Sequence, residues 1–265
     1  MNAIVFLGGG RITSALVTGL RRGGYEGPIV VHDRHSAKLG RLKREHGVIA
    51  EASLPRALGS AGLLIIAVRP GSVGALLKQI GKEGIRGPIT AVSLAAGIPL
   101  SQLQTALGQP VRWVRAMPSP VCRSRRGLTA LTFGRGLSKR ERTKVRSLFA
   151  RTGDVVEIPE KQFDAFTVTY SCSHGYHALQ ALIAAAEGIG LNRRIARMAA
   201  AHALADGITA WREGDLSLKS LMHEAATPGG IAASVMASLD RAGYGKLVAQ
   251  GLRTGIHQAR RNARR

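Results

Sequence analysis

The sequence has little of what marks secreted and membrane proteins. Its 265 residues include only two cysteines, too few for a disulfide framework, so nothing indicates an oxidising compartment. No apolar stretch reaches about 18 uninterrupted residues, so we expect no membrane-spanning helix. The N-terminus lacks the basic region and cleavage site of a signal peptide, because residues 3–7 have the character of a buried strand. We therefore expect a soluble, cytoplasmic protein with no membrane partner.

Acidic residues are also scarce. Asp and Glu number 16 against 38 Lys and Arg, a formal net charge of +22, which makes nucleic acid or another anionic partner worth testing. The basic residues are scattered through clusters such as 41–44, 123–126 and 135–146, and aromatic residues make up only 4% of the chain. A groove for single strands needs aromatic side chains on which bases stack. We interpret the charge as a solvated basic surface and do not expect nucleic-acid binding to be the main function.

The first 158 residues alternate short apolar runs with helical patterns. We predict strands at 3–7, 29–32, 63–68, 89–93, 111–117, 128–133 and 154–158. Helices fit at 12–22, 73–80, 100–106 and 138–150, and Ser36 can cap another. This alternation is typical of a doubly wound parallel sheet with helices on both faces.

The composition changes after residue 158. Alanine and helix-period leucine dominate to the end, with no convincing strand, and we predict helices near 162–188, 192–212, 217–225, 230–242 and 246–263. The chain is therefore expected to have an α/β domain over 1–158 followed by an all-α domain over 159–265.

A glycine-rich turn follows the first predicted strand and opens the first helix. Gly8 permits a tight turn, and Gly10 lets the backbone approach a pyrophosphate. The helix beginning at Arg11 and Ile12 offers free N–H groups and a positive dipole end to the phosphates. Thr13 stands where a third glycine is usual, and an ordinary glycine turn is the alternative. Within a βαβ unit the pattern predicts a dinucleotide-binding, Rossmann-like domain.

The end of the second predicted strand offers two ways to recognise a cofactor. Asp33 could hold the ribose 2′-hydroxyl of NAD, whereas Arg34 could hold the 2′-phosphate of NADP. Arg11 and Lys38 add positive charge nearby and favour NADP, with NAD left open.

Later strand ends carry small residues or prolines, which suit backbone that lies against a flat cofactor ring. A doubly wound sheet places its ligand at the carboxyl ends of its strands. We therefore predict that the cofactor contacts Ala67, Val68, Arg69, Pro70, Ala95 and Gly97.

Taken in order, these segments resemble the motifs of the pyrroline-5-carboxylate reductase family. Six family motifs have counterparts here. In the cofactor half they are G-x-G-N-M-A at 8–13, A-V-K-P at 67–70 and S-x-A-A-G at 93–97. The later ones are R-x-M-P-N at 115–119, G-S-G-P at 172–175 and S-P-G-G-T-T at 227–232. The resemblance implies a Rossmann domain followed by a helical dimerisation domain, in a homodimer or a larger assembly of dimers. It also implies NAD(P)H-dependent reduction of a cyclic imine carboxylate, 1-pyrroline-5-carboxylate, to proline.

The substrate-side motifs depart from the family pattern. Two threonines of the last motif are replaced by Ile231 and Ala232, which removes two hydroxyl donors. Three groups could still bind a carboxylate: the Ser173 hydroxyl and the amides of Gly229 and Gly230. His174 could protonate the imine or pair with the carboxylate, because an imidazole titrates near neutral pH. These residues are the predicted catalytic set.

Two other readings of the substrate side stay open. One is a reductase of a different cyclic imine or ketimine, and the other is a non-catalytic nucleotide-binding homologue. A metal site would need Cys172, His174 and His177, and no fourth ligand stands at a fixed spacing, so we expect none.

Overall fold

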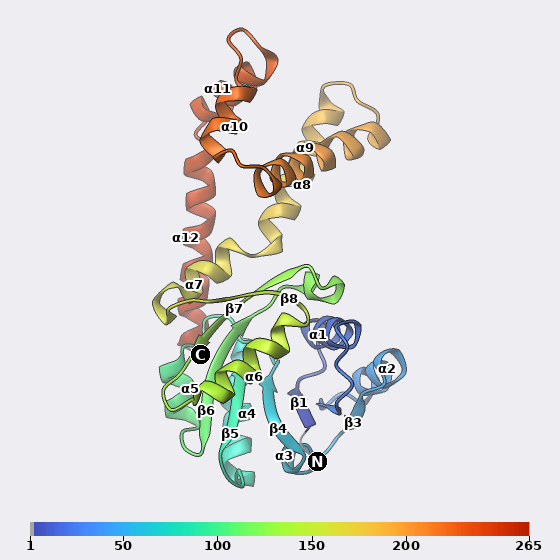
Figure 1. Ribbon diagram of the computed structural model, residues 1–265, viewed down its shortest axis with the longest axis vertical. Helices are drawn as coiled ribbons and strands as arrows, with labels where there is room; N and C mark the ends of the chain where they lie inside the picture. The colour runs from blue at the N-terminus through green and yellow to red at the C-terminus, as the bar shows by residue number, and fades with distance from the viewer. Residues whose placement is uncertain (1–2, 265) are drawn as a thin grey trace. The chain divides into compact units, whose positions relative to one another are not determined.

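Eight strands form one sheet in the computed structural model, which describes residues 3–264 apart from the side chain of Cys172 (Figure 1). The strands are β1 (Ala3–Leu7), β2 (Ile29–His32), β3 (Ile49–Glu51), β4 (Ala61–Ile66), β5 (Ile89–Ser93), β6 (Val111–Met117), β7 (Gly127–Phe133) and β8 (Gly153–Glu157). Their order across the sheet is β3-β2-β1-β4-β5-β6-β7-β8. The order reverses between β1 and β4, which is the point where doubly wound sheets bind their ligands.

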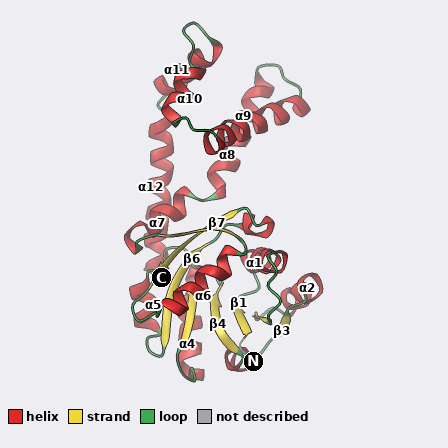
Figure 2. Ribbon diagram, viewed as in Figure 1, coloured by secondary structure: helices red, strands yellow, loops and turns green. Residues whose placement is uncertain are grey.

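Helices cover both faces of this sheet (Figure 2). They are α1 (Arg11–Arg22), α2 (Ser36–His46), α3 (Leu54–Gly59), α4 (Pro70–Glu83), α5 (Leu100–Ala106), the short 3-10 helix η1 (Pro120–Ser124), α6 (Lys139–Ala150) and α7 (Glu160–Thr169). Because successive strand residues point to opposite faces, Ile4 and Phe6 pack in one core with Leu16 of α1 and Phe149 of α6. Val5 and Leu7 belong to a second core, with α4 and α5, on the other face.

The Rossmann-like sheet is confirmed, with its last two strands, β7 and β8, running opposite to the other six. All neighbouring strands are parallel except β6 and β7, which pair antiparallel, with Val114 opposite Phe133. The connection between them contains only η1, which is too short for a parallel crossover.

Several predicted boundaries are wrong for local reasons. The strand predicted at 63–68 ends at Ile66, so residues 67–69 form a loop, and the short elements β3 and α3 were not predicted. Ser36 is the first residue of α2 and not its cap. The helix predicted over 162–188 is broken, because Ser171 accepts a hydrogen bond from the Ser173 amide and starts a new helix.

The chain divides into two compact units. One contains the sheet, α7 and the last turns of the final helix, over residues 1–170 and 255–265, and the other spans residues 171–254. The remaining helices are α8 (Cys172–Gly188), α9 (Arg193–Glu213), α10 (Leu218–Ala225), α11 (Ile231–Arg241) and α12 (Tyr244–Ala263). The predicted domain boundary after residue 158 is the point where strands give way to helices. The two compact units meet later, after residue 170, because α7 packs with the sheet. Within residues 3–264, no helix is long and apolar enough to cross a membrane.

Candidate functional site

The carboxyl ends of four strands lie together at one edge of the sheet. The Gly8 amide donates to the His32 carbonyl at 2.8 Å, and the Ala67 amide donates to the Leu7 carbonyl at 2.9 Å. Leu94 extends the row by donating to the Ile66 carbonyl at 3.0 Å. The structure therefore brings together the segments that follow β1, β2, β4 and β5, which hold all the predicted cofactor residues.

The glycine turn after β1 is shaped for close backbone approach. Gly8 has φ +114°, and a Cβ on it would lie 2.7 Å from the Ala67 carbonyl oxygen. Thr13 is fully buried, and its hydroxyl donates to the Gly8 carbonyl at 2.6 Å, so the residue at the third glycine position ties the turn to the helix. Gly10 has open space where a Cβ would stand.

The N-terminus of α1 leaves amides available to a ligand. The first helical hydrogen bond runs from the Ser14 amide to the Gly10 carbonyl at 3.1 Å, so the amides of Arg11, Ile12 and Thr13 precede the helical ladder. Gly10, the cap residue, has no side chain to occupy them. Amides of this kind, at the positive end of a helix dipole, bind phosphate.

Asp33 is engaged within the protein. Its Oδ2 accepts from the Gly9 amide at 2.8 Å, and its Oδ1 accepts from the His35 amide at 2.9 Å and lies 2.8 Å from the His35 ring. Lys38 Nζ lies 3.4 Å from Oδ2. Partial burial alone would raise the pKa of Asp33, but these hydrogen bonds and the Lys38 charge outweigh it and lower the pKa to about 2. Asp33 thus holds the glycine turn, and Arg34 beside it is exposed.

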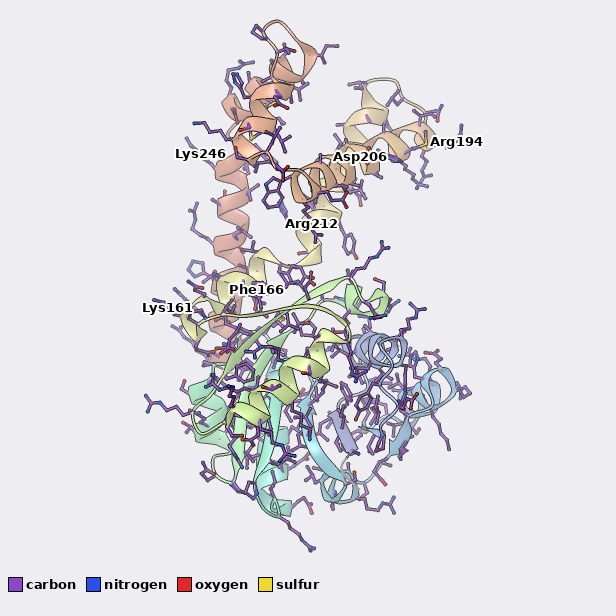
Figure 3. The ribbon with its side chains drawn as sticks, in the orientation of Figure 1. Lys161, Phe166, Arg194, Asp206, Arg212 and Lys246 are labelled. Atoms are coloured by element: carbon purple, nitrogen blue, oxygen red, sulfur yellow. The ribbon has the colours of Figure 1, made fainter. Side chains whose placement is uncertain are left out.

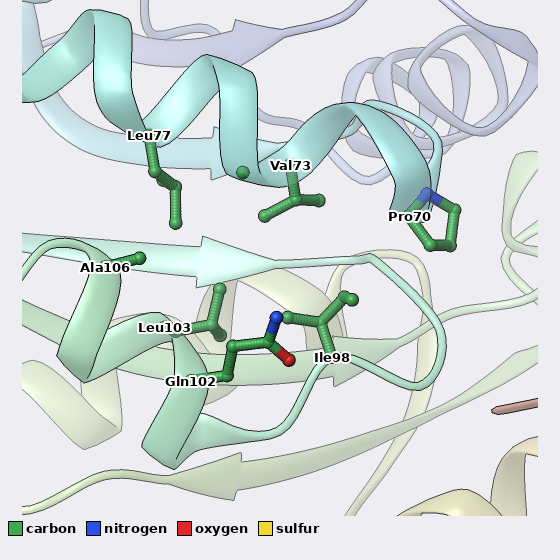
Figure 4. Close-up of a pocket in the computed structure, with 8 residues that line it drawn as sticks. Pro70, Val73, Leu77, Ile98, Gln102, Leu103 and Ala106 are labelled. Atoms are coloured by element: carbon green, nitrogen blue, oxygen red, sulfur yellow. The ribbon is translucent and has the colours of Figure 1, made fainter. Parts of the chain in front are cut away.

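The loops after β4 and β5 flank a shallow apolar groove between α4 and α5 (Figure 4). Arg69 is exposed at the start of α4, whereas Ala95 and Gly97 are buried. The groove is lined by Pro70, Val73, Gly74, Leu77, Ile98, Gln102, Leu103 and Ala106. It holds no charged side chain to match a phosphate, so we place the candidate site at the amides of α1.

The predicted catalytic residues stand at two helix starts in the second unit. Ser173 and His174 lie in the first turn of α8, both exposed, with the Ser173 hydroxyl 2.6 Å from that of Ser171. Gly229 has φ +74°, and Gly230 caps α11. No hydrogen bond or ion pair between described residues joins the two segments.

The expectation of no metal at this end of α8 stays a prediction, because one of the three candidate ligands is not described. The Cys172 side chain lies outside the described residues. Within them, no group of three His, Cys, Asp or Glu side chains could hold an ion.

Sequence reasoning missed an ionic cluster between β6 and α7, built around a buried arginine. The Arg115 guanidinium is 2% exposed and pairs with Glu160 and Asp164 of α7, each at 2.9 Å. It also lies 4.1 Å from the ring of Phe163. Leu100, at the start of α5, donates its amide to the same Glu160 oxygen at 3.0 Å. The sequence signal for this cluster was Arg115 inside an apolar strand, followed by two acidic residues, Glu160 and Asp164, at helical spacing.

The end of α7 is anchored to the sheet as well. The Tyr170 hydroxyl accepts a hydrogen bond from the Leu128 amide at 2.6 Å. Its ring lies 5.3 Å from that of Phe166, which Figure 3 labels.

Comparisons with known proteins agree along the chain. Residues 160–262 match the family model for pyrroline-5-carboxylate reductase dimerisation, and residues 3–97 match the model named NADP oxidoreductase coenzyme F420-dependent. A pyrroline-5-carboxylate reductase of Mycobacterium tuberculosis is 29% identical, covering 92% of this chain and 91% of the relative. Another, of Pseudomonas aeruginosa, is 25% identical over 94% of this chain and 92% of its own length.

Solved structures show the same fold. A pyrroline-5-carboxylate reductase of Coxiella burnetii has a TM-score of 0.86 at 24% identity, covering 98% of each chain. The pyrroline carboxylate reductase of Plasmodium falciparum, solved with NADP bound, has a TM-score of 0.87 at 19% identity, covering 99% of this chain and 98% of its own.

Proposed function

Since the chain belongs to the pyrroline-5-carboxylate reductase family, we propose that it reduces 1-pyrroline-5-carboxylate to proline with NADPH. The observation that carries the cofactor half is the turn from Gly8 to Thr13. It combines open space at Gly10 with amides that precede the helical ladder of α1. The residues present therefore fit a dinucleotide pyrophosphate.

The choice of NADPH over NADH is supported by the hydrogen bonds that Asp33 already makes within the protein. A carboxylate offers about four acceptor sites, and those of Asp33 already face the Gly9 amide, the His35 amide and ring, and Lys38 Nζ, which leaves little capacity for a ribose 2′-hydroxyl. Arg34 is exposed beside it and would hold the 2′-phosphate, because a guanidinium matches phosphate oxygens. The loops at Ala67–Pro70 and at Ala95 and Gly97 would hold the other half of the cofactor.

Bound NADPH supplies a hydride, and the chain's own residues prepare the imine to accept it. An imine carbon accepts hydride faster when its nitrogen carries a proton, so the site needs a proton source. In this proposal the His174 ring holds that proton. The Ser173 hydroxyl and the amides of Gly229 and Gly230 bind the substrate carboxylate, each at a helix N-terminus that favours an anion.

A second copy of the chain is the partner in this proposal. The helices of residues 171–254 leave large apolar side chains on their surface, including Ile231 at 86% and Ile189 at 85% exposure, with Leu247 at 63%. Large apolar side chains left exposed in such number are typical of a surface that a second subunit covers. We therefore propose a homodimer, or a larger assembly built on it. A cytoplasmic setting and the absence of a nucleic-acid role remain predictions.

Steady-state oxidation of NADPH tests the activity. We expect turnover with 1-pyrroline-5-carboxylate that falls by about 100-fold or more in His174→Asn, since general acid catalysis contributes that much. His177→Asn, an exposed histidine one turn along α8, is the matched control and should stay near wild type. Equal effects of the two substitutions would contradict the role of His174.

The loss of two hydroxyls at Ile231 and Ala232 favours a second candidate, a reductase of a different cyclic imine. A six-membered cyclic imine carboxylate, assayed beside the five-membered one, separates the two. A higher kcat/KM for the larger ring would favour the second candidate. Cofactor binding without turnover of either would identify a non-catalytic homologue.

A further inference from the structure

The turn between β5 and α5 is held by the end of the last helix. Gly97 has φ +80°, and a Cβ on it would overlap the Ala259 carbonyl oxygen and lie 2.9 Å from its carbon. Ala259 is 5% exposed. Three residues further on, Asn262 donates its side-chain amide to the Ala96 carbonyl at 3.3 Å. Its amide oxygen accepts from Gln258 at 3.0 Å, which fixes the orientation of the group.

The same turn is attached at both of its ends. At the start, the Ser93 hydroxyl oxygen accepts from the Ala95 amide at 3.3 Å. At the far end, the Leu100 amide donates to Glu160 of α7, and that carboxylate is held by Arg115. Residues 93–100 are therefore attached to α7 and α12 as well as to the sheet.

The last turns of α12 also lie closely on α7. A Cβ on Gly255 would stand 2.8 Å from Val168 Cγ1, so only a glycine allows this approach without a shift. The glycines at 97 and 255 thus let α12 lie close to the turn at one point and to α7 at the other.

We infer that residues 259–262 of α12 are a positioning element for the nicotinamide half of the cofactor site, acting through Gly97 and Asn262. This rests on the proposed function. In a sheet of this order, β1 to β3 form one mononucleotide half and β4 to β6 form the other. The glycine turn and Arg34 belong to the first half, whereas the turn at 93–97 belongs to the second. Gly97 acts by admitting the helix, which sets the position of the backbone that we predict to lie against the cofactor.

Two substitutions in the full-length protein test this inference. Gly97→Ala forces the turn and α12 apart. Asn262→Ala removes the hydrogen bond to the Ala96 carbonyl and the one from Gln258, on a partly exposed helix end where the risk to folding is small. Gly136→Ala is the matched control, because Gly136 has φ +81° and open space where the Cβ would stand. Calorimetry measures the Kd of NADPH and that of 2′-phospho-ADP-ribose, which lacks the nicotinamide. Hydrogen exchange of residues 93–99 is followed in the ligand-free protein.

We expect Gly97→Ala to weaken NADPH binding by about 10- to 100-fold, because the overlap with the Ala259 backbone displaces the turn and overpacking costs of the usual size correspond to that factor in an equilibrium constant. Asn262→Ala should weaken it less, and both should bind 2′-phospho-ADP-ribose as the control does. Exchange of 93–99 should be faster in both variants and unchanged in Gly136→Ala.

Two results would overturn the inference while leaving the proposed function intact. One is a wild-type Kd for NADPH in both variants, and the other is an equal loss for the two ligands. A wild-type protein that binds neither ligand would overturn the proposed function, and this inference with it.

Discussion

Removing the buried Arg115 guanidinium should destabilise the sheet-containing unit more than any surface charge does. The substitution Arg115→Met keeps an unbranched side chain of similar length but leaves Glu160 and Asp164 without their partner. Each lost charge-assisted hydrogen bond is worth about 1.5–3 kcal/mol. The contact with the Phe163 ring adds about 1 kcal/mol. Both carboxylates are 35% exposed, so water recovers part of the loss.

We therefore expect the free energy of unfolding to fall by about 3 kcal/mol, at the lower end of the range for breaking a buried ion pair. Arg146→Met is the matched control, because Arg146 is 47% exposed and pairs with Glu157 at the surface. Its loss should stay below about 1 kcal/mol.

Urea unfolding at one fixed protomer concentration measures these differences, since assembly would otherwise shift the midpoint. The buried Trp113 of β6 reports on the sheet by fluorescence in a Trp211→Phe background. Adding Glu160→Gln and Asp164→Asn to Arg115→Met should restore part of the lost stability, because no carboxylate is then left unpaired. Equal, small losses for Arg115→Met and Arg146→Met would refute the reasoning.

Three further predictions concern single side chains. The pKa of Asp33 is lowered to about 2, so its stabilisation, about 1 kcal/mol after solvent screening, is complete above about pH 5 and is lost as pH falls toward 2. Urea titrations between pH 2 and 6 give the free energy of unfolding as a function of pH. Asp33→Asn should remove its rise between pH 2 and 5, and an unchanged pH dependence would contradict the anchoring role of Asp33. Arg34→Ala should weaken NADPH by about tenfold or more relative to NADH, whereas Arg41→Ala, exposed on α2, should not; titrations of both cofactors decide this. Burial raises the pKa of the Cys122 thiol to about 12. In a Cys172→Ser background a thiol reagent should therefore react only as the protein unfolds, and fast labelling at pH 8 would argue against a buried thiol.

The architecture could be predicted from the sequence because its signals are local. The apolar runs and helix periods of residues 1–158 depend on neighbours within a few positions, and the structure confirms the Rossmann-like sheet followed by helices. The glycine turn was recognisable for the same reason, since Gly8 and Gly10 stand next to the strand and the helix that they join. The prediction failed at a finer level, because one helix was predicted over 162–188 where Ser171 separates α7 from α8.

The roles of individual residues could not be predicted, because they depend on contacts between distant positions. The sequence favoured Arg34 over Asp33 only through the charge around it, and the hydrogen bond from the Gly9 amide, 24 positions away, to the Asp33 carboxylate could not be foreseen. Thr13 was a loose match to a glycine until its hydroxyl was seen to hold the turn.

The sequence by itself determined the fold class, the resemblance to the reductase family and the place of the glycine turn, because short-range periodicity and ordered motifs specify them. Only the tertiary structure decided what several of the motif residues do. The glycine at position 97 was predicted to contact a cofactor, and its Cβ position is filled by the backbone of Ala259. The hydrogen bond beside it joins positions 166 apart in the chain, and no local pattern encodes a separation of that length.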